Sequence, residues 1–73
     1  MIGEHIDTGD NVTWNWAKGT AQGKVVEWSS ASLSFVSDGE TFFMDGTAEN
    51  PVYLLEKENG ERVLKQLSEL NKV

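Results

Sequence analysis

The first part of the chain alternates strictly between polar and apolar residues. In segment 11–16, Val12, Trp14 and Trp16 fall at every second position, with asparagine or threonine between them. Successive side chains of a strand point to opposite faces, so this period of two predicts a half-buried strand. Residues 21–29 follow a short glycine-containing turn and favour a second strand. The pattern therefore predicts an N-terminal β-hairpin.

A glycine, Gly23, lies inside the second of these strands. Glycine within a strand commonly marks a bulge or a place where another group approaches the backbone closely, as at a barrel corner. We therefore expect the strand to bend or to pack closely at this position.

Two more hairpins are indicated by turn signals between apolar runs. Asp38-Gly39 and Asn59-Gly60 are dipeptides that favour the backbone conformations of tight hairpin turns. Pro51 cannot donate a ladder hydrogen bond, so we expect it at the first residue of a strand, after a turn-like loop. The strands expected around these signals are 33–36, 41–44, 52–57 and 62–65.

The end of the chain has a different spacing. Leu64, Leu67 and Leu70 recur every three residues, which suits a 3₁₀ or α-helical turn, and a short strand is the alternative. Short strands at close spacing predict an all-β domain, a small barrel or sandwich of about five strands. We expect a flexible N-terminus at 1–8, the barrel at 9–70 and a C-terminal tail at 71–73.

Size and charge limit the function classes. The chain has 73 residues, no cysteine and a formal charge of −6. A domain this small buries a modest core, so packing of its aromatic and aliphatic side chains must supply the stability. The acidic balance disfavours nucleic acid and anionic membranes and is compatible with cationic partners. Without cysteines or a visible signal peptide, a cytoplasmic location is expected.

Several segments together resemble one family. The first is the run 9–16, and the second is the pattern of glycine and valine in 19–27. Further similar segments are 49–56, Asn59-Gly60, 63–65 and 68–70. Over residues 9–70 the chain is similar to the hypervirulence-associated TUDOR-domain family. The resemblance implies an SH3-like, Tudor-type barrel of about five strands, whereas residues 29–44 are richer in serine and phenylalanine than is usual for it.

The large apolar residues have two possible roles, because a barrel of this size has few other side chains to fill it. We expect a core made by one set of them: Val12, Trp14, Val26, Trp28, Leu54 and Val63. The other role is a binding surface. Aromatic rings attract cations, and neighbouring carboxylates strengthen the attraction, as in cages for methylated lysine or arginine. The residues expected to form such an aromatic-acidic face are Trp16, Phe43, Asp45, Glu49 and Tyr53.

These patterns predict a non-enzymatic binding or adaptor module that recognises a protein or peptide, with a basic peptide as one option. Nucleic-acid binding and a structural, self-associating role are the alternatives. No catalytic triad, phosphate-binding glycine motif or cofactor signature is visible, so no cofactor is expected. His5, Asp7 and Asp10 are spaced like metal ligands, but solvated polar residues are the expected interpretation.

Overall fold

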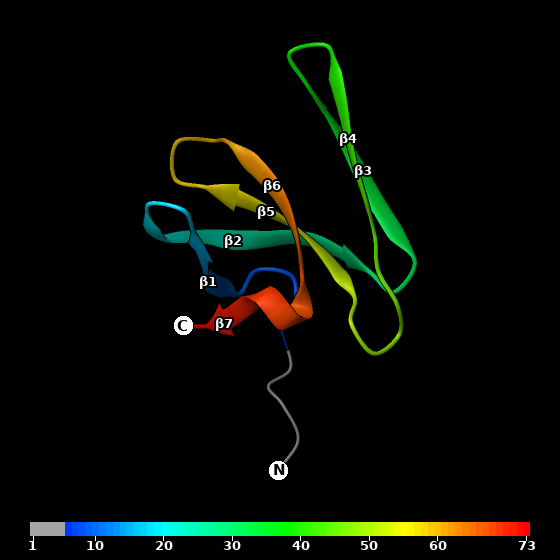
Figure 1. Ribbon diagram of the computed structural model, residues 1–73, viewed down its shortest axis with the longest axis horizontal. Coiled ribbons are helices and arrows are strands. Elements are labelled where there is room, and N and C mark those ends of the chain that lie inside the picture. Colours follow the sequence, from blue (N-terminus) through cyan, green and yellow to red (C-terminus); the bar gives the residue numbers. More distant parts are fainter. Residues whose placement is uncertain (1–5) are drawn as a thin grey trace.

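The computed structural model describes residues 6–73, which form seven strands and one 3₁₀ helix (Figure 1). The elements are β1 (Asn11–Trp16), β2 (Gly19–Ser29), β3 (Ser32–Ser37), β4 (Glu40–Asp45), β5 (Val52–Lys57), β6 (Arg62–Gln66), η1 (Leu67–Glu69) and β7 (Leu70–Lys72). The predicted all-β class and the 3₁₀ turn near the C-terminus are confirmed. None of the described residues belongs to a helix long and apolar enough to cross a membrane.

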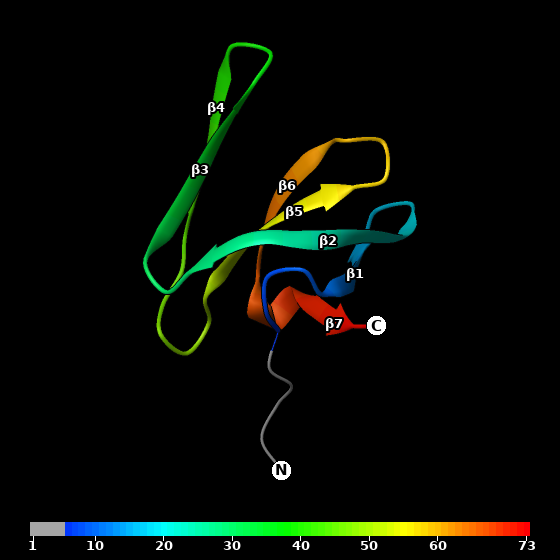
Figure 2. The ribbon, with the colours of Figure 1, turned by 180° about the vertical axis from the view of Figure 1, so that it is seen from behind.

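Five of the strands build the barrel. Their order in the sheet is β6-β5-β2-β1-β7, with every neighbouring pair antiparallel. The two edge strands, β6 and β7, are consecutive in the chain and are joined by η1, so the sheet curls round one core. The remaining strands, β3 and β4, pair only with each other. They form a hairpin, inserted between β2 and β5, that projects from the barrel (Figures 1 and 2).

The barrel core lies inside the curled sheet. It consists of Ile6, Val12, Trp14, Val25, Tyr53, Leu55 and Leu70, with Ala21, Val63 and Leu67 packed against it. Full burial of one such aliphatic side chain contributes about 1.5–3 kcal/mol. The predicted core positions Val12 and Trp14 are confirmed, and Val63 contributes as a half-buried neighbour.

Gly23 explains how the Trp14 ring fits into this core. A Cβ atom at Gly23 would lie 3.0 Å from Cη2 of Trp14 and 2.9 Å from the carbonyl oxygen of Glu56. Both distances are shorter than ordinary van der Waals contact, so only glycine leaves room for the indole and the neighbouring strand. The close approach predicted from the sequence is thus present.

A bulge in β2 changes which of its residues face the core. The pairing of β2 with β5 shifts between Val25 and Glu27. Val25 belongs to the barrel core, whereas Val26 packs on the other side of the sheet. A bulge adds one residue to a strand and therefore reverses the alternation beyond it. Val26 and Trp28 were both expected in the core, and the structure places them on opposite faces of β2.

The prediction that Trp28 belongs to the core is wrong. Its side chain is 41% exposed. The register pairs it with Tyr53, and the two rings stack with centroids 6.1 Å apart. Trp28 therefore covers the buried Tyr53 from outside, at the end of the strand, where the core no longer surrounds it.

A second apolar cluster, here called the hairpin cluster, lies between the barrel and the β3–β4 hairpin. It contains Val52, Leu54 and Leu64, with Val26, Leu33, Phe35 and Met44 packed against them. The residues of β5 alternate between the two clusters, which is why this strand is buried on both faces. The predicted burial of Leu54 is confirmed here, outside the barrel.

Structural contacts extend beyond residues 9–70 at both ends. Residues 1–5 lie outside the described residues, but Ile6 is 2% exposed and belongs to the barrel core. The backbone N–H of Asp7 donates to Oδ2 of Asp10 at 2.8 Å and fixes the turn that follows. At the other end, β7 pairs with β1, so the expected tail is mostly strand.

Candidate functional site

The structure does not gather the residues of the predicted aromatic-acidic face. Trp16 ends β1 at the β1–β2 turn and is 50% exposed, whereas Phe43 is on β4 and is 64% exposed. The β1–β2 turn and the β3–β4 hairpin lie on different sides of the molecule (Figures 1 and 2). Asp45 ends β4, and Glu49 lies in the following loop. These four residues therefore do not form one surface.

Tyr53, the fifth residue of the predicted face, is part of the barrel core and is 3% exposed. Its hydroxyl donates a hydrogen bond to the carbonyl oxygen of Ile6 at 3.1 Å. Burial raises the pKa of the hydroxyl, and the nearby carboxylates of Asp7 and Asp10 raise it further. Tyr53 is a structural residue that anchors the N-terminal segment, so the expectation that it meets a partner is wrong.

The loop between β4 and β5 is held by its own polar groups. The backbone N–H of Asn50 donates to Oγ1 of Thr47 at 3.0 Å. The Asn50 side chain accepts from the N–H of Ser68 at 2.9 Å and donates to its hydroxyl at 3.2 Å. These bonds dock the loop on η1. The loop thus positions the start of β5.

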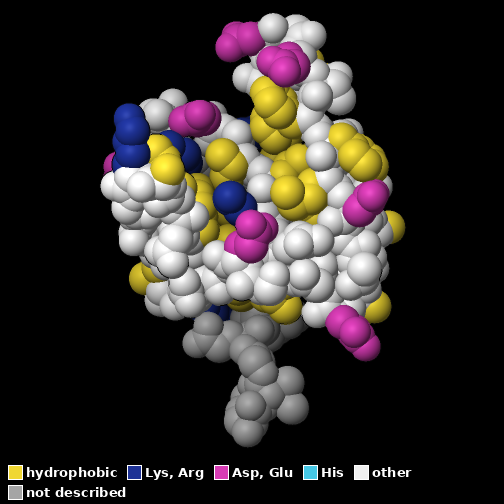
Figure 3. Space-filling view, viewed as in Figure 1, with side chains coloured by type: hydrophobic (Ala, Val, Ile, Leu, Met, Phe, Trp, Pro, Cys, Tyr) yellow, Lys and Arg dark blue, Asp and Glu magenta, His cyan; other side chains and the backbone are white. Residues whose placement is uncertain are grey.

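A groove opens between the β3–β4 hairpin and β6. It has a volume of about 330 Å³ and is lined by Phe35, Phe42, Phe43, Met44, Arg62, Val63, Leu64 and Lys65. Figure 3 shows hydrophobic side chains along the hairpin and in the hollow beside it. Phe35 and Phe42 pair across the hairpin and stack with centroids 5.0 Å apart. The groove is therefore apolar and aromatic on its hairpin side.

The charges that line this groove are all positive. Arg62 and Lys65 line its β6 side, and no acidic residue is among the lining residues. Their own ion pairs are long and exposed: Arg62 lies 3.8 Å from Glu56, and Lys65 lies 4.0 Å from Glu69. Exposed pairs of this kind contribute little and exchange easily. Both cations are thus available to a ligand, in a chain whose net charge is −6.

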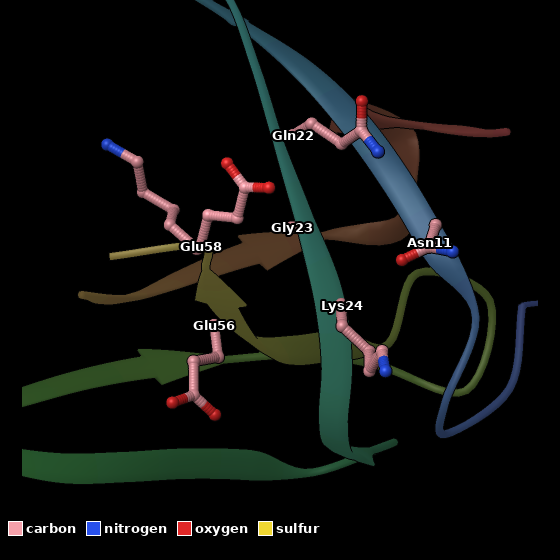
Figure 4. A pocket seen from close by; sticks show the side chains of 7 residues that line it. Asn11, Gln22, Gly23, Lys24, Glu56 and Glu58 are labelled. Carbon is pink, nitrogen blue, oxygen red and sulfur yellow. The ribbon is translucent and has the colours of Figure 1, made fainter. Parts of the chain in front are cut away.

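A second hollow lies on the outer face of the barrel. Its volume is about 450 Å³, and it is lined by Asn11, Gln22, Gly23, Lys24, Glu56, Lys57 and Glu58 (Figure 4). These side chains come from β1, β2, β5 and the turn after β5. Apart from Gly23 they are polar and of mixed charge. This hollow has neither the aromatic wall nor the single sign of charge that the groove shows.

The metal-ligand spacing near the N-terminus does not correspond to a described site. His5 lies outside the described residues, and among residues 6–73 no group of three or more histidine, cysteine or acidic side chains is placed to hold a metal ion. The Asp10 carboxylate accepts from the N–H of Asp7 and lies 3.5 Å from Nζ of Lys72. Its position is explained by these structural contacts.

Of the five residues predicted to form the binding face, only Phe43 lines the groove. The other residues that line the groove were not predicted as site residues from the sequence. One signal could have found part of it. A two-residue Asp38-Gly39 turn fixes the hairpin register and places Phe35 opposite Phe42. The approach of this hairpin to β6 depends on tertiary packing and has no local signal.

Comparison with known proteins adds one match. Residues 9–70 match the family described as hypervirulence associated proteins, TUDOR domain. No curated protein and no solved structure matches the sequence. The match covers the barrel and the inserted hairpin together.

Proposed function

We propose a binding function for this chain, which belongs to the family of hypervirulence-associated TUDOR domains: recognition of a peptide segment in the groove between β4 and β6. Tudor-type domains are generally small, non-catalytic binding modules. The observation that supports the groove is its composition, an aromatic wall opposite two cations on an otherwise acidic protein. Apolar grooves with a few convergent polar groups are the usual form of ligand sites.

The charge of the groove favours a partner segment that carries carboxylates. Arg62 can bind a carboxylate through two parallel N–H donors, and Lys65 adds a second positive charge. The composition alone suggested a basic partner, because acids dominate the chain. The groove is positive although the whole chain is negative, and the charge next to a bound ligand affects its binding most. The overall charge of −6 still opposes binding of nucleic acid.

Self-association is a second candidate, supported by a separate observation. Val36 and Phe43 are 67% and 64% exposed on the β3–β4 hairpin. The register places both on the hairpin face opposite to Phe35 and Phe42. Exposed apolar side chains on a projecting hairpin are a typical site for pairing between copies.

Substitutions inside and outside the groove test the proposed site. The probe is a blocked synthetic peptide of alternating valine and glutamate, titrated by calorimetry. Arg62→Gln, which keeps the fold because the side chain is exposed, should weaken binding about tenfold through loss of one charge-assisted contact. Lys18→Gln removes the same charge at the β1–β2 turn and should leave affinity within about twofold.

Equal weakening by both substitutions would indicate unspecific attraction and contradict the proposal. Sedimentation of the free protein over a range of concentrations tests the second candidate. A dimer that Val36→Ser dissociates would favour self-association, and a strict monomer would contradict it.

A further inference from the structure

One edge of β6, the strand whose residues line the groove, pairs with no other strand among the described residues. At one end of the β5–β6 pair, the N–H of Lys57 donates to the carbonyl of Glu61 at 2.8 Å. At the other end, the N–H of Leu67 donates to the carbonyl of Pro51 at 2.9 Å. Both bonds continue the register of the β5–β6 residue pairs that lie between them. In an antiparallel pair, residues bonded to the partner strand alternate with residues whose N–H and C=O point away from it.

This alternation assigns each residue of β6 to one edge. Val63 and Lys65 bond to β5, whereas Arg62, Leu64 and Gln66 direct their N–H and C=O groups to the open edge. The bond from the N–H of Gln66 to Oε1 of Glu69, at 2.8 Å, agrees with this assignment, because it lies on the open side. Leu64 is 9% exposed, yet β6 has no strand on that edge among the described residues.

The edge of β4 that borders the groove can be assigned in the same way. The N–H of Gly46 donates to the carbonyl of Ala31 at 2.6 Å and continues the register of the hairpin. Phe42 and Met44 therefore bond to β3, and Phe43 and Asp45 direct their backbone groups outward. At the base of the groove, the side chain of Gln66 donates to the carbonyl of Asp45 at 3.2 Å. The groove thus lies between two open strand edges that are joined at one end.

From this end the two edges diverge, as both ribbon views show (Figures 1 and 2). A strand placed beside β6 would lie about 4.8 Å from it. Its amides and carbonyls would meet those of Arg62 and Leu64, which are in the correct alternation for pairing. Its apolar side chains on one face would meet Phe35 and Phe42, which line the same groove.

We propose that the partner binds as an extended strand that adds to the open edge of β6, and so becomes a sixth strand of the barrel sheet. The inference rests on the proposed function and specifies its mode. The partner is an extended segment with apolar residues at alternate positions and carboxylates for the two cations of the groove, Arg62 and Lys65. Strand addition derives its affinity from main-chain hydrogen bonds and its specificity from the pockets for alternate side chains. The added strand would also bond the outward N–H and C=O of Leu64.

Amide hydrogen exchange, measured by NMR on the whole chain, tests the mode at single residues. The probe is the blocked alternating valine–glutamate peptide. We expect the amides of Arg62 and Leu64 to exchange at least tenfold more slowly when the peptide is bound. The amides of Val63 and Lys65 already bond to β5, so their exchange should change much less. A ligand that only covered the groove would slow exchange at all four residues and would not produce this alternation in amide protection.

Backbone methylation of the peptide supplies the matched control. One version carries N-methyl groups on its valines and another on its glutamates, so each loses the donors of a single strand edge. Strand addition to β6 predicts that one version loses at least tenfold in affinity while the other binds within about threefold of the parent.

The outcomes separate the mode from the site. Chemical-shift changes over the groove, with uniform exchange at residues 62–65 and equal binding of the two methylated peptides, would overturn strand addition and leave the groove as the site. Changes confined to surfaces outside the groove, or none at millimolar peptide, would overturn both. The same alternating protection of amides 62–65 could appear without peptide as the protein concentration rises. That result would show that a second copy of the chain pairs with the edge, and it would overturn the proposal of a different partner.

Discussion

The side chain of Gln66 donates a hydrogen bond to the carbonyl oxygen of Asp45, 3.2 Å away, and so joins β6 to the end of β4. The two strands belong to different sheets, and no ladder connects them. This bond therefore joins the hairpin to β6 at one end of the groove, in addition to the packing of the hairpin cluster. The binding surface depends on it, although neither residue lies among the aromatic residues that line the groove.

We expect Gln66→Met to loosen the hairpin without unfolding the barrel. Methionine keeps the length of the side chain but cannot donate, so about 1 kcal/mol of stability is lost. Heteronuclear NOE values should fall for β3 and β4 and stay unchanged for β1 and β2. Gln22→Met makes the same exchange on the outer face of β2 and is the control. Equal effects of the two substitutions would show that the bond does not hold the hairpin.

The two tryptophans of the N-terminal hairpin that were both expected in the core should now differ in stability. Trp14 is 3% exposed and Trp28 is 41% exposed. Trp14→Ala should cost about 3–5 kcal/mol, close to the whole stability of a domain this small. Trp28→Ala loses the stacking on Tyr53 and part of a buried surface, about 1–2 kcal/mol. Urea unfolding of both variants measures the difference, and similar costs would contradict the assigned core.

The contrast between Trp14 and Trp28 shows which buried positions could be predicted from the sequence. Strict alternation in segment 11–16 identified β1 and the burial of Val12 and Trp14, because no bulge interrupts that strand. In β2 the bulge after Val25 separates the faces of Val26 and Trp28, which were both expected in the core. Gly23 indicated an irregularity close by, but its own role is to make room for Trp14. In β2 the glycine therefore lies where another group approaches the backbone, and the bulge lies further along the strand, after Val25.

The candidate site was less predictable than the fold, for a physical reason. Tyr53 was assigned to the aromatic-acidic face because its ring could attract a cation, although it lies in the apolar run 52–55, which suits a strand buried on both faces. It is buried because β5 is covered on one face by the barrel core and on the other by the hairpin cluster. The groove itself arises where β6 meets a hairpin about twenty residues earlier in the chain. Such a meeting of distant edges leaves no periodic signal.

Tyr53 gives the domain a dependence on alkaline pH. Burial and the carboxylates of Asp7 and Asp10 raise its pKa above the ordinary value of 10.0. Below pH 10 the folded and unfolded states both keep the proton. Above it the unfolded state loses the proton first, so the folded state binds more protons and stability falls as pH rises.

We therefore expect the stability advantage of the wild type over Tyr53→Phe to stay constant up to about pH 9 and to shrink as the pH rises through 10. Lysines titrate in both proteins, so their effect cancels in the difference. Tyr53 is the single tyrosine of the chain, so the absorbance of tyrosinate reports its ionisation directly. A midpoint at or below the ordinary tyrosine pKa, or a constant difference in stability, would contradict the buried hydroxyl.

The most direct test of the binding groove is a map of chemical-shift changes on the isotope-labelled protein, titrated with the valine–glutamate peptide. The account predicts changes concentrated at residues 42–44 and 62–65, on the two sides of the groove. Changes concentrated instead at the β1–β2 turn around Trp16, with residues 42–44 and 62–65 unmoved, would contradict it.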